Sequence, residues 1–429
     1  RTEAASVDGG TSGGAGSPHR LSTSFGLRIS AAAPQASAAN TTALKAIFAA
    51  ALLPVPANKL NACTWPGLRT LSATRNFFSG GLPQRAASYA AMTSLEILDL
   101  GINYLSGPIP AALAMLPILQ SLTLDANRLS GKIPPALLKN DLTDLSLDWN
   151  QLSGDLRRQQ INPAFIGLSR NRLAGNFNTI RFNEYLSFIN VSENSFSGSF
   201  PHILCRSGSL LSADLSHNRL TGTVPANCFK SASNILDLFL SHNNFTGGIP
   251  QSLTALPQLI YLDLGANALT GPIPTFCKTK QQLIYLNLAS NALSGPPTPL
   301  SSPSCSASLA FLYLSSNCLS GPIPATISSF TRLNRLLLDK NVLTGAIPAG
   351  VSKMQRLQGL GLSYNRLTGR IPAVWPAGVR TVQLAGNRLS GAVPAALSKL
   401  KRGLFKPGNP SLCGKPLPAC AYDPNPLCV

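Results

Sequence analysis

An asparagine that recurs at nearly constant spacing constrains this chain more than any other feature. Its positions are Asn76, Asn103, Asn127, Asn150, Asn171, Asn194, Asn218, Asn243, Asn267, Asn291, Asn317, Asn341, Asn365 and Asn387. They mark 14 units, with spacings of 21 to 27 residues. A glycine stands four residues after every one of them, and a proline stands seven residues after eleven of them. A repeat period of this length is typical of a solenoid, in which each unit is one coil.

The letters of one unit predict its local structure. In the stretch Tyr261–Pro274, YLDLGANALTGPIP, Leu262 and Leu264 alternate with other residues, as in a short strand with one buried face. The asparagine ends the strand, and its amide can satisfy backbone groups of its own and the neighbouring coil. The glycine adopts backbone angles that other residues avoid, and the proline has no N–H to leave unsatisfied. The segment after the proline, such as Gln251–Leu259, is expected to form one short helical or 3₁₀ turn.

These motifs resemble the plant-type leucine-rich repeat family. Its LSGxIP form occurs as LSGPIP at Leu105–Pro110 and Leu319–Pro324, and the resemblance extends from about Leu68 to Leu397. It implies an α/β solenoid, a right-handed superhelix with a concave parallel β-sheet and about 14 repeats, whose concave face usually carries the partner. Arrays of this kind serve as receptor ectodomains or, in polygalacturonase-inhibitor-like proteins, as inhibitors of wall-degrading enzymes.

The two ends of the array are expected to be capped, since a solenoid leaves its core open there. Residues 1–40 are rich in Ser, Gly and Ala and predict a flexible segment, and residues 41–67 resemble a degenerate N-terminal cap. The repeats then occupy 68–397, and 398–429 form the C-terminal cap and tail. The stretch Gly408–Cys420 resembles the C-terminal cap of extracellular members, and this resemblance implies a disulfide between Cys413 and Cys420.

The remaining cysteines suggest structural roles. Cys205, Cys228 and Cys277 fall on the helical side of their repeats and are expected to be small buried apolar side chains. Cys305 and Cys318 lie in adjoining parts of one irregular repeat and could pair.

Three N-glycosylation acceptors occur, at Asn40, Asn190 and Asn244, and Asn190 is expected on the concave face. Together with the cap cysteines, they favour a secretory, oxidising route.

Candidate ligand-binding residues follow from the strand period, because residues two, four and six before each asparagine should point to the concave face. The predicted set there is Phe239, Tyr261, Tyr285, Phe311 and Tyr313, with Asp237, Asp263 and Arg335 beside them. Aromatic side chains on a solvent-facing sheet are typical of interfaces. The alternative is that they form a cross-strand ladder that stabilises the sheet itself.

The formal net charge of +19 makes an anionic partner conceivable. The sequence contains no nucleic-acid-binding motif, however, and we do not expect the protein to bind nucleic acid. Nine of the sixteen acidic residues occupy concave or rim positions: Asp99, Asp125, Asp144, Asp148, Glu193, Asp214, Asp237, Asp263 and Asp339. Arginines that directly follow the repeat asparagine are expected to line one edge of the array; they are Arg128, Arg172, Arg219, Arg366 and Arg388. An anionic surface would therefore meet the flanks and not the concave face.

The sequence offers little for catalysis. His217 and His242 stand one repeat apart beside Asp214 and Asp237, so a metal site is conceivable, although SHN is also a plain variant of the repeat. No nucleophile elbow, phosphate loop or Cys–His arrangement is present, and we expect neither an enzyme nor a cofactor.

We therefore predict a non-enzymatic recognition protein, secreted or a receptor ectodomain at the cell surface, that binds a protein, peptide or glycan on its concave face. No run of apolar residues in this chain is long enough to span a membrane and no kinase domain is present, so signalling would need a further segment or a co-receptor. The alternative is an intracellular scaffold for protein–protein interaction, with reduced cysteines and unused glycosylation acceptors.

Overall fold

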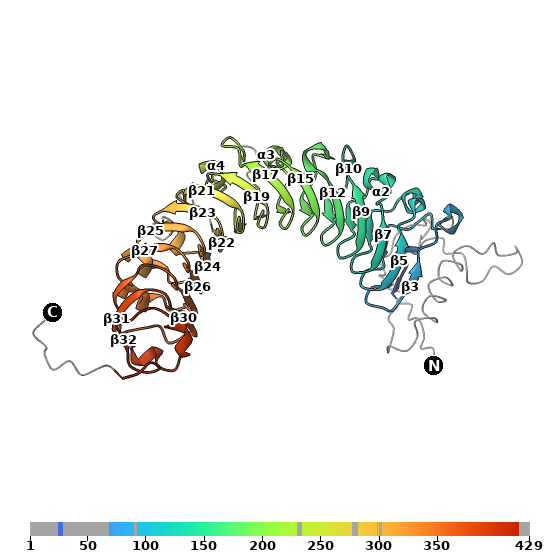
Figure 1. The fold of residues 1–429 in the computed structure, drawn as a ribbon. Coiled ribbons are helices and arrows are strands. Elements are labelled where there is room, and N and C mark those ends of the chain that lie inside the picture. Colours follow the sequence, from blue (N-terminus) through green and yellow to red (C-terminus); the bar gives the residue numbers. More distant parts are fainter. Residues whose placement is uncertain are drawn as a thin grey trace, which may run out of the picture. The chain divides into compact units, whose positions relative to one another are not determined.

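A computed structural model describes residues 25–28 by their backbone, and residues 68–89, 92–229, 234–276, 282–297, 299 and 303–419. The chain divides into two compact units, one ending at Gly198 and the other beginning at Ser199. Each unit is a stack of coils in which an inner, concave sheet and an outer set of strands are joined by short turns and helices (Figure 1). Within the segment expected to be flexible, β1 (Phe25–Arg28) pairs in parallel with β2.

The inner sheet contains one short parallel strand from each coil. In the first unit these strands are β2 (Leu68–Ser72), β4 (Ile97–Asp99), β6 (Ser121–Thr123), β8 (Asp144–Ser146), β11 (Phe165–Gly167) and β14 (Phe188–Asn190). In the second they are β16 (Ser212–Asp214), β18 (Asp237–Phe239), β20 (Tyr261–Asp263), β22 (Tyr285–Asn287), β24 (Phe311–Tyr313), β26 (Arg335–Leu337), β28 (Gly359–Gly361) and β30 (Thr381–Gln383). The middle residue of each three-residue strand, such as Leu262, is buried, as the alternating pattern predicts.

A second series of strands begins one residue or more after each repeat asparagine. In the first unit it consists of β3 (Ser79–Gly81), β5 (Tyr104–Pro108), β7 (Arg128–Gly131), β9 (Gln151–Asp155), β12 (Arg172–Asn176) and β15 (Ser195–Gly198). In the second it consists of β17 (Arg219–Thr223), β19 (Asn244–Gly247), β21 (Ala268–Pro272), β23 (Ala292–Gly295), β25 (Cys318–Pro322) and β27 (Val342–Thr344), followed by β29 (Thr368–Arg370), β31 (Arg388–Ala392) and β32 (Leu412–Cys413). A separate pair, β10 (Gln160–Ile161) with β13 (Arg181–Phe182), adds to the first unit. The LSGxIP segments therefore form the outer strands.

Short helices close the coils. They are α2 (Pro135–Lys139), α3 (Ile203–Arg206), α4 (Gln251–Thr254) and α5 (Pro303–Ser306), with the 3₁₀ helices η1 (Ala86–Ser88), η2 (Ala111–Met115), η3 (Phe177–Thr179), η5 (Ala325–Ser329), η6 (Ala349–Lys353), η7 (Ala395–Leu397) and η8 (Arg402–Leu404). The repeat proline directly precedes several of them, as Pro250 precedes α4. Its fixed φ suits the entry, and it has no N–H to leave unpaired there. Leu253 of α4 is fully buried, which contributes about 1.5–3 kcal/mol to the core.

The repeat asparagines bind the backbone of two neighbouring coils, as the sequence predicts. The side-chain nitrogen of Asn267 donates to the carbonyl oxygens of Leu240, Leu264 and Gly265 at 3.0, 3.2 and 3.1 Å. Its oxygen accepts from the backbone N–H of Phe245 at 3.0 Å. The residue before it, Ala266, has a φ of 50°, a left-handed conformation that turns the chain out of the strand.

Asn409 makes the same contacts, although it lies in the segment expected to form the cap. Its side chain donates to Leu384 and Phe405 at 2.8 and 2.9 Å and accepts from the N–H of Leu389 at 2.9 Å. The residue at the fourth position after Asn409 is Cys413 and not glycine, so the repeat pattern does not reveal it.

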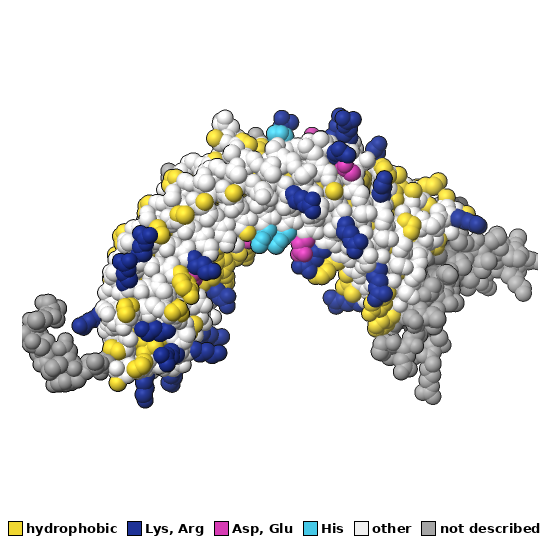
Figure 2. Space-filling view, in the orientation of Figure 1, with side chains coloured by type: hydrophobic (Ala, Val, Ile, Leu, Met, Phe, Trp, Pro, Cys, Tyr) yellow, Lys and Arg dark blue, Asp and Glu magenta, His cyan; other side chains and the backbone are white. Residues whose placement is uncertain are grey.

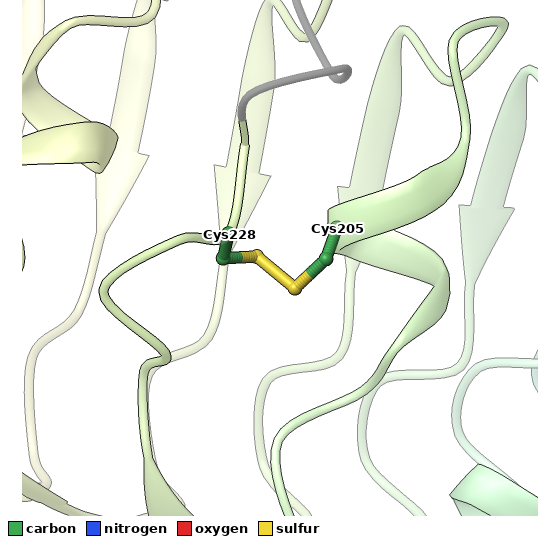
Figure 3. The surroundings of a disulfide bond; sticks show 2 residues. All are labelled: Cys205 and Cys228. Carbon is green, nitrogen blue, oxygen red and sulfur yellow. A yellow bond between two sulfur atoms is a disulfide. The ribbon is translucent and has the colours of Figure 1, made fainter.

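Two expectations about cysteines are wrong. Cys228 is buried but Cys205 only half-buried, and the two form a disulfide with a Cα–Cα distance of 4.5 Å (Figure 3). The two residues stand 23 apart, one coil in sequence, so their side chains meet on the helical side. Cys305 and Cys318 do not pair, because Cys318 at the start of β25 is a free, exposed thiol, whereas Cys305 is buried and disulfide-bonded.

Cys413 is disulfide-bonded, and Cys420, its expected partner, lies outside the described residues, as does Cys277. The pairing of Cys413 with Cys420 therefore stays a prediction. Within the part of the chain that the structure describes, no helix is both long and apolar enough to cross a membrane.

Candidate functional site

The inner sheet of the second unit places the predicted ligand-binding residues in two rows. Because the strands pair in register, Tyr261 lies beside Asp237 on one side and Tyr285 on the other. One row consists of Asp237, Tyr261, Tyr285, Phe311 and Arg335. The second row consists of Phe239, Asp263, Asn287, Tyr313 and Leu337. All of them are half-buried or exposed, so the predicted side chains share one solvent-facing surface.

Four of these side chains form a continuous aromatic strip, which we define as Tyr261, Tyr285, Phe311 and Tyr313. The ring of Tyr285 is central, with centroids 6.3 Å from Tyr261, 6.3 Å from Phe311 and 5.5 Å from Tyr313. Tyr261 is 39% exposed and the others are half-buried. Phe239 shares the face but makes no ring contact with these four in the described part of the chain. The strip therefore offers ring faces and edges to solvent on a fixed scaffold.

Asp263 holds the strip in place from the second row. Its carboxylate accepts from the side-chain nitrogen of Asn287 at 2.9 Å, from the N–H of Gly265 at 2.9 Å and from the hydroxyl of Tyr285 at 3.4 Å. Burial raises the pKa of the Tyr285 hydroxyl, and the negative charge of Asp263 and the neighbouring Tyr313 add to the effect. Tyr285 is therefore a neutral hydrogen-bonding group throughout the physiological pH range.

The aromatic strip is flanked by opposite charges along its row. Asp237 precedes Tyr261 on the neighbouring strand, and the exposed Arg335 follows Phe311 on the other side. Burial raises the pKa of the Asp237 carboxyl, while the hydroxyl of Ser212 lowers it. The face is thus apolar in the middle, acidic at one end and basic at the other.

His217 and His242, at the rim of the same sheet, stack face to face with ring centroids 3.9 Å apart and an interplanar angle of 12°. The lone pair of an imidazole nitrogen lies in the plane of the ring, so parallel stacked rings do not direct two nitrogens at one ion. No group of three metal-ligating side chains is found among the described residues.

The glycosylation acceptors differ in accessibility. Asn244 is exposed at the start of β19. Asn190 ends β14 on the inner face, as expected, and its side-chain oxygen accepts from the N–H and the hydroxyl of Ser192 at 3.1 and 2.7 Å. Asn40 lies outside the described residues.

Sequence reasoning missed a contact between a carboxylate and a glycine beside the strip. Gly359 and Gly361 are the first and last residues of β28, next to Arg335 and Leu337. The carboxylate of Asp339 lies over Gly361, where any Cβ would overlap it, and accepts from the N–H of Ser363 at 2.8 Å. The sequence does carry a sign of this contact, because both concave-face positions of β28 are glycine.

A second missed feature is the charge of the C-terminal coils. Lys and Arg predominate between residues 331 and 419, where Asp339 is the single acidic residue. Figure 2 shows these basic side chains spread over the surface around β26–β32. The edge arginines Arg128, Arg172, Arg219, Arg366 and Arg388 are all exposed, as expected.

Comparison with known proteins agrees with the repeat. The sequence profile of the leucine-rich repeat family matches residues 209–269, and a second profile of that family matches 308–330. No curated protein matches the sequence.

Among solved structures, the chain is similar to the Arabidopsis receptor kinase HAESA in complex with the peptide hormone IDA and the co-receptor SERK1. The identity is 28% and the TM-score 0.64, over 81% of this chain and 62% of that chain. It is also similar to the plant peptide hormone receptor RGFR1 in complex with RGF2, with 25% identity and a TM-score of 0.58, over 81% of this chain and 64% of that chain. The chain therefore spans less than two thirds of the length of these receptor chains.

The asparagine ladder, the LSGxIP outer strands, the family profiles and these structural similarities agree. The chain is a leucine-rich repeat protein of the plant type.

Proposed function

We propose that this protein is a ligand-recognition module that binds a peptide, or an extended segment of a protein, across the aromatic strip of its second unit. The observation that carries the proposal is the continuous contact of the four rings on an open sheet, with no segment of the described chain covering them. Tyrosine rings are efficient contact groups because they add large amphipathic area at a small cost in conformational entropy.

The flanking charges specify the ligand further. From Asp237 to Arg335 the row crosses four strand steps, about 19 Å at the usual strand spacing, which an extended peptide of about six residues would span. Such a ligand would place a positive group near Asp237, apolar or aromatic side chains over the rings and a negative group near Arg335. A glycan ligand lacks this dipolar arrangement, so a peptide or protein is favoured.

An extracellular location supports the same function. The Cys205–Cys228 disulfide and the disulfide-bonded Cys305 and Cys413 suit an oxidising compartment, and Asn244 is an exposed acceptor for a glycan. HAESA was solved with the peptide hormone IDA and the co-receptor SERK1, and the peptide hormone receptor RGFR1 was solved with RGF2. By this similarity we propose a receptor-like protein that presents a bound peptide to a co-receptor.

Selection from a random dodecapeptide display library tests the proposal, because a library of this kind samples many peptides at once and requires no defined ligand. Wild-type protein is the target of the selection, and the double variant Tyr261→Ala/Tyr285→Ala is used afterwards to measure the affinity of the enriched peptides. We expect enriched peptides that bind the wild type and lose at least about tenfold in affinity for the variant, as at other tyrosine-rich interfaces. Enriched peptides that bind both proteins equally, while both show the same circular dichroism and melting temperature, would contradict it.

A further inference from the structure

The inner face of the first unit contains a hollow that the recognition proposal does not use. It has a volume of about 300 Å³ and lies over β6, β8, β11 and β14. It is lined by Gly167, by the buried Leu145 and Ile166, and by the solvent-facing Ser121, Thr123, Asp144, Ser146, Asp148, Phe165 and Phe188. Every one of these residues belongs to the first unit, so the hollow is complete without the second.

The absence of a side chain at Gly167 creates the floor of the hollow. The carboxylate of Asp148 lies over this glycine, and a Cβ there would overlap it. One oxygen of Asp148 accepts from the N–H of Ser169 at 2.6 Å, and the other accepts from the hydroxyl of Ser146 at 3.2 Å. Two hydrogen bonds therefore fix the orientation of the carboxylate at the edge of the hollow.

Two phenyl rings form one wall. Phe165 and Phe188 are register partners on β11 and β14, and their rings are 6.3 Å apart with an interplanar angle of 22°. The side chain of Phe165 is 45% exposed, although phenylalanine side chains are usually buried. Ring faces carry negative electrostatic potential and attract a cation placed over them.

The charge of the hollow is uncompensated. Asp144 is the register partner of Phe165, so its carboxylate borders the aromatic wall. No Lys, Arg or His lines the hollow, and the ion pairs of the described residues, Arg69–Glu96, Arg157–Asp155 and Arg170–Glu193, do not involve Asp144 or Asp148. Burial raises the pKa of the Asp144 carboxyl, which a bound cation would reverse.

We propose that this hollow is a binding site for an arginine side chain of a peptide or protein ligand. A guanidinium is planar, so it can lie against the phenyl rings while its N–H groups donate to Asp144 and Asp148. The hydroxyls of Ser121 and Thr123 face the same space as further acceptors. The site is separate from the aromatic strip and does not rest on the function proposed for it.

The second unit contains a natural control for this arrangement. There Asp339, Gly361 and Ser363 reproduce the positions and contacts of Asp148, Gly167 and Ser169. The positions that correspond to Asp144 and Phe165, however, are Arg335 and Gly359. The same contact thus lies beside a positive charge, with no ring at the position of Phe165, and it should not bind a guanidinium.

Titration of the full chain with N-acetyl-arginine methylamide, followed by NMR or calorimetry, tests the proposal. The matched ligand is N-acetyl-citrulline methylamide, which keeps the shape and loses the charge. We expect saturable binding of the arginine compound, at least about tenfold weaker binding of the citrulline compound, and a similar loss in Asp144→Asn. The control variant Asp339→Asn should bind as the wild type does.

A second variant, at the aromatic wall, tests the site independently in case Asp144→Asn does not fold. Phe165→Ala removes the exposed ring at the aromatic wall and should weaken binding of the arginine compound severalfold while the protein keeps its melting temperature. Equal affinity for the two compounds, or unchanged affinity in a folded Asp144→Asn protein, would overturn the proposal. The peptide selection on the aromatic strip can succeed or fail independently of either result.

Discussion

At the scale of single residues, the fold depends on buried amides that satisfy the backbone of two coils at once. Asn341 donates to the carbonyls of Leu314, Leu338 and Asp339 at 3.0, 3.0 and 3.2 Å and accepts from the N–H of Leu319 at 2.9 Å. An apolar replacement leaves these buried groups without partners, and an unpaired buried polar group costs about 1–3 kcal/mol.

We therefore expect Asn341→Ala to lower the free energy of unfolding of its part of the array by about 2–4 kcal/mol. Urea unfolding followed by circular dichroism measures the change. Asn334→Ala is the matched control, because Asn334 is a half-buried asparagine of the same repeat with no side-chain hydrogen bond among the described residues. Equal losses of unfolding free energy in the two variants would show that the hydrogen bonds of the repeat asparagine do not stabilise the array.

The carboxylate of Asp339, beside the aromatic strip, predicts that the stability of the fold depends on pH. Burial raises the pKa of Asp339, although the N–H of Ser363, the hydroxyl of Ser315 and the charge of Lys340 oppose the shift. The folded protein thus holds the Asp339 proton more tightly than the unfolded chain does. The stabilisation from protonation is complete below about pH 4 and is lost as the pH rises through the folded pKa.

Asp339→Asn should accordingly be more stable than the wild type at pH 7, since its side-chain oxygen still accepts from Ser363. The advantage should shrink as the pH falls toward about 4, where the wild-type carboxyl is itself protonated. Denaturant midpoints of both proteins at pH 7 and pH 4 measure it. An advantage that is constant with pH would show that charge burial is not its cause.

At the scale of elements, alternating leucines and the spacing of Asn, Gly and Pro were sufficient to predict the inner strands and the short helices. They did not predict the outer strands, whose residues after the asparagine were read only as turn positions. Cysteine pairing was not predictable in the same way. Cys205 and Cys228 stand four and three residues after their repeat prolines, and only the stacking of consecutive coils brings their sulfurs together. Residue spacing gave no reason to prefer a bond there over the wrong pair, Cys305 with Cys318.

The double variant Cys205→Ala/Cys228→Ala should lose about 3 kcal/mol, because a cross-link that closes a loop of this length restricts the unfolded chain by that amount. Thermal unfolding measures the loss, and Cys318→Ala, which removes a free exposed thiol, should leave stability unchanged. Peptide mapping without reduction should recover a Cys205–Cys228 linked peptide. Its absence from protein isolated from its native source with free thiols blocked would refute the bond and would count against an oxidising compartment.

At the scale of the whole molecule, the sequence predicted which side chains face inward but not what the surface between them looks like. The row from Asp237 to Arg335 follows directly from counting residues before the asparagine. The hollow, by contrast, depends on Gly167 admitting a carboxylate from the adjacent coil, and Gly361 makes the same contact with Asp339. Such a contact joins residues about one repeat apart, and their spacing alone does not show it.

The central claim is that the aromatic strip, and not inward-facing apolar residues in general, binds the ligand. Tyr261 and Ile97 occupy the same position in their repeats, and each is 39% exposed. The affinity of a library-selected peptide for Tyr261→Ala and for Ile97→Ala, measured by calorimetry, compares them directly. We predict at least about a tenfold loss for Tyr261→Ala and no change for Ile97→Ala. Equal affinities of both variants and the wild type would contradict the claim.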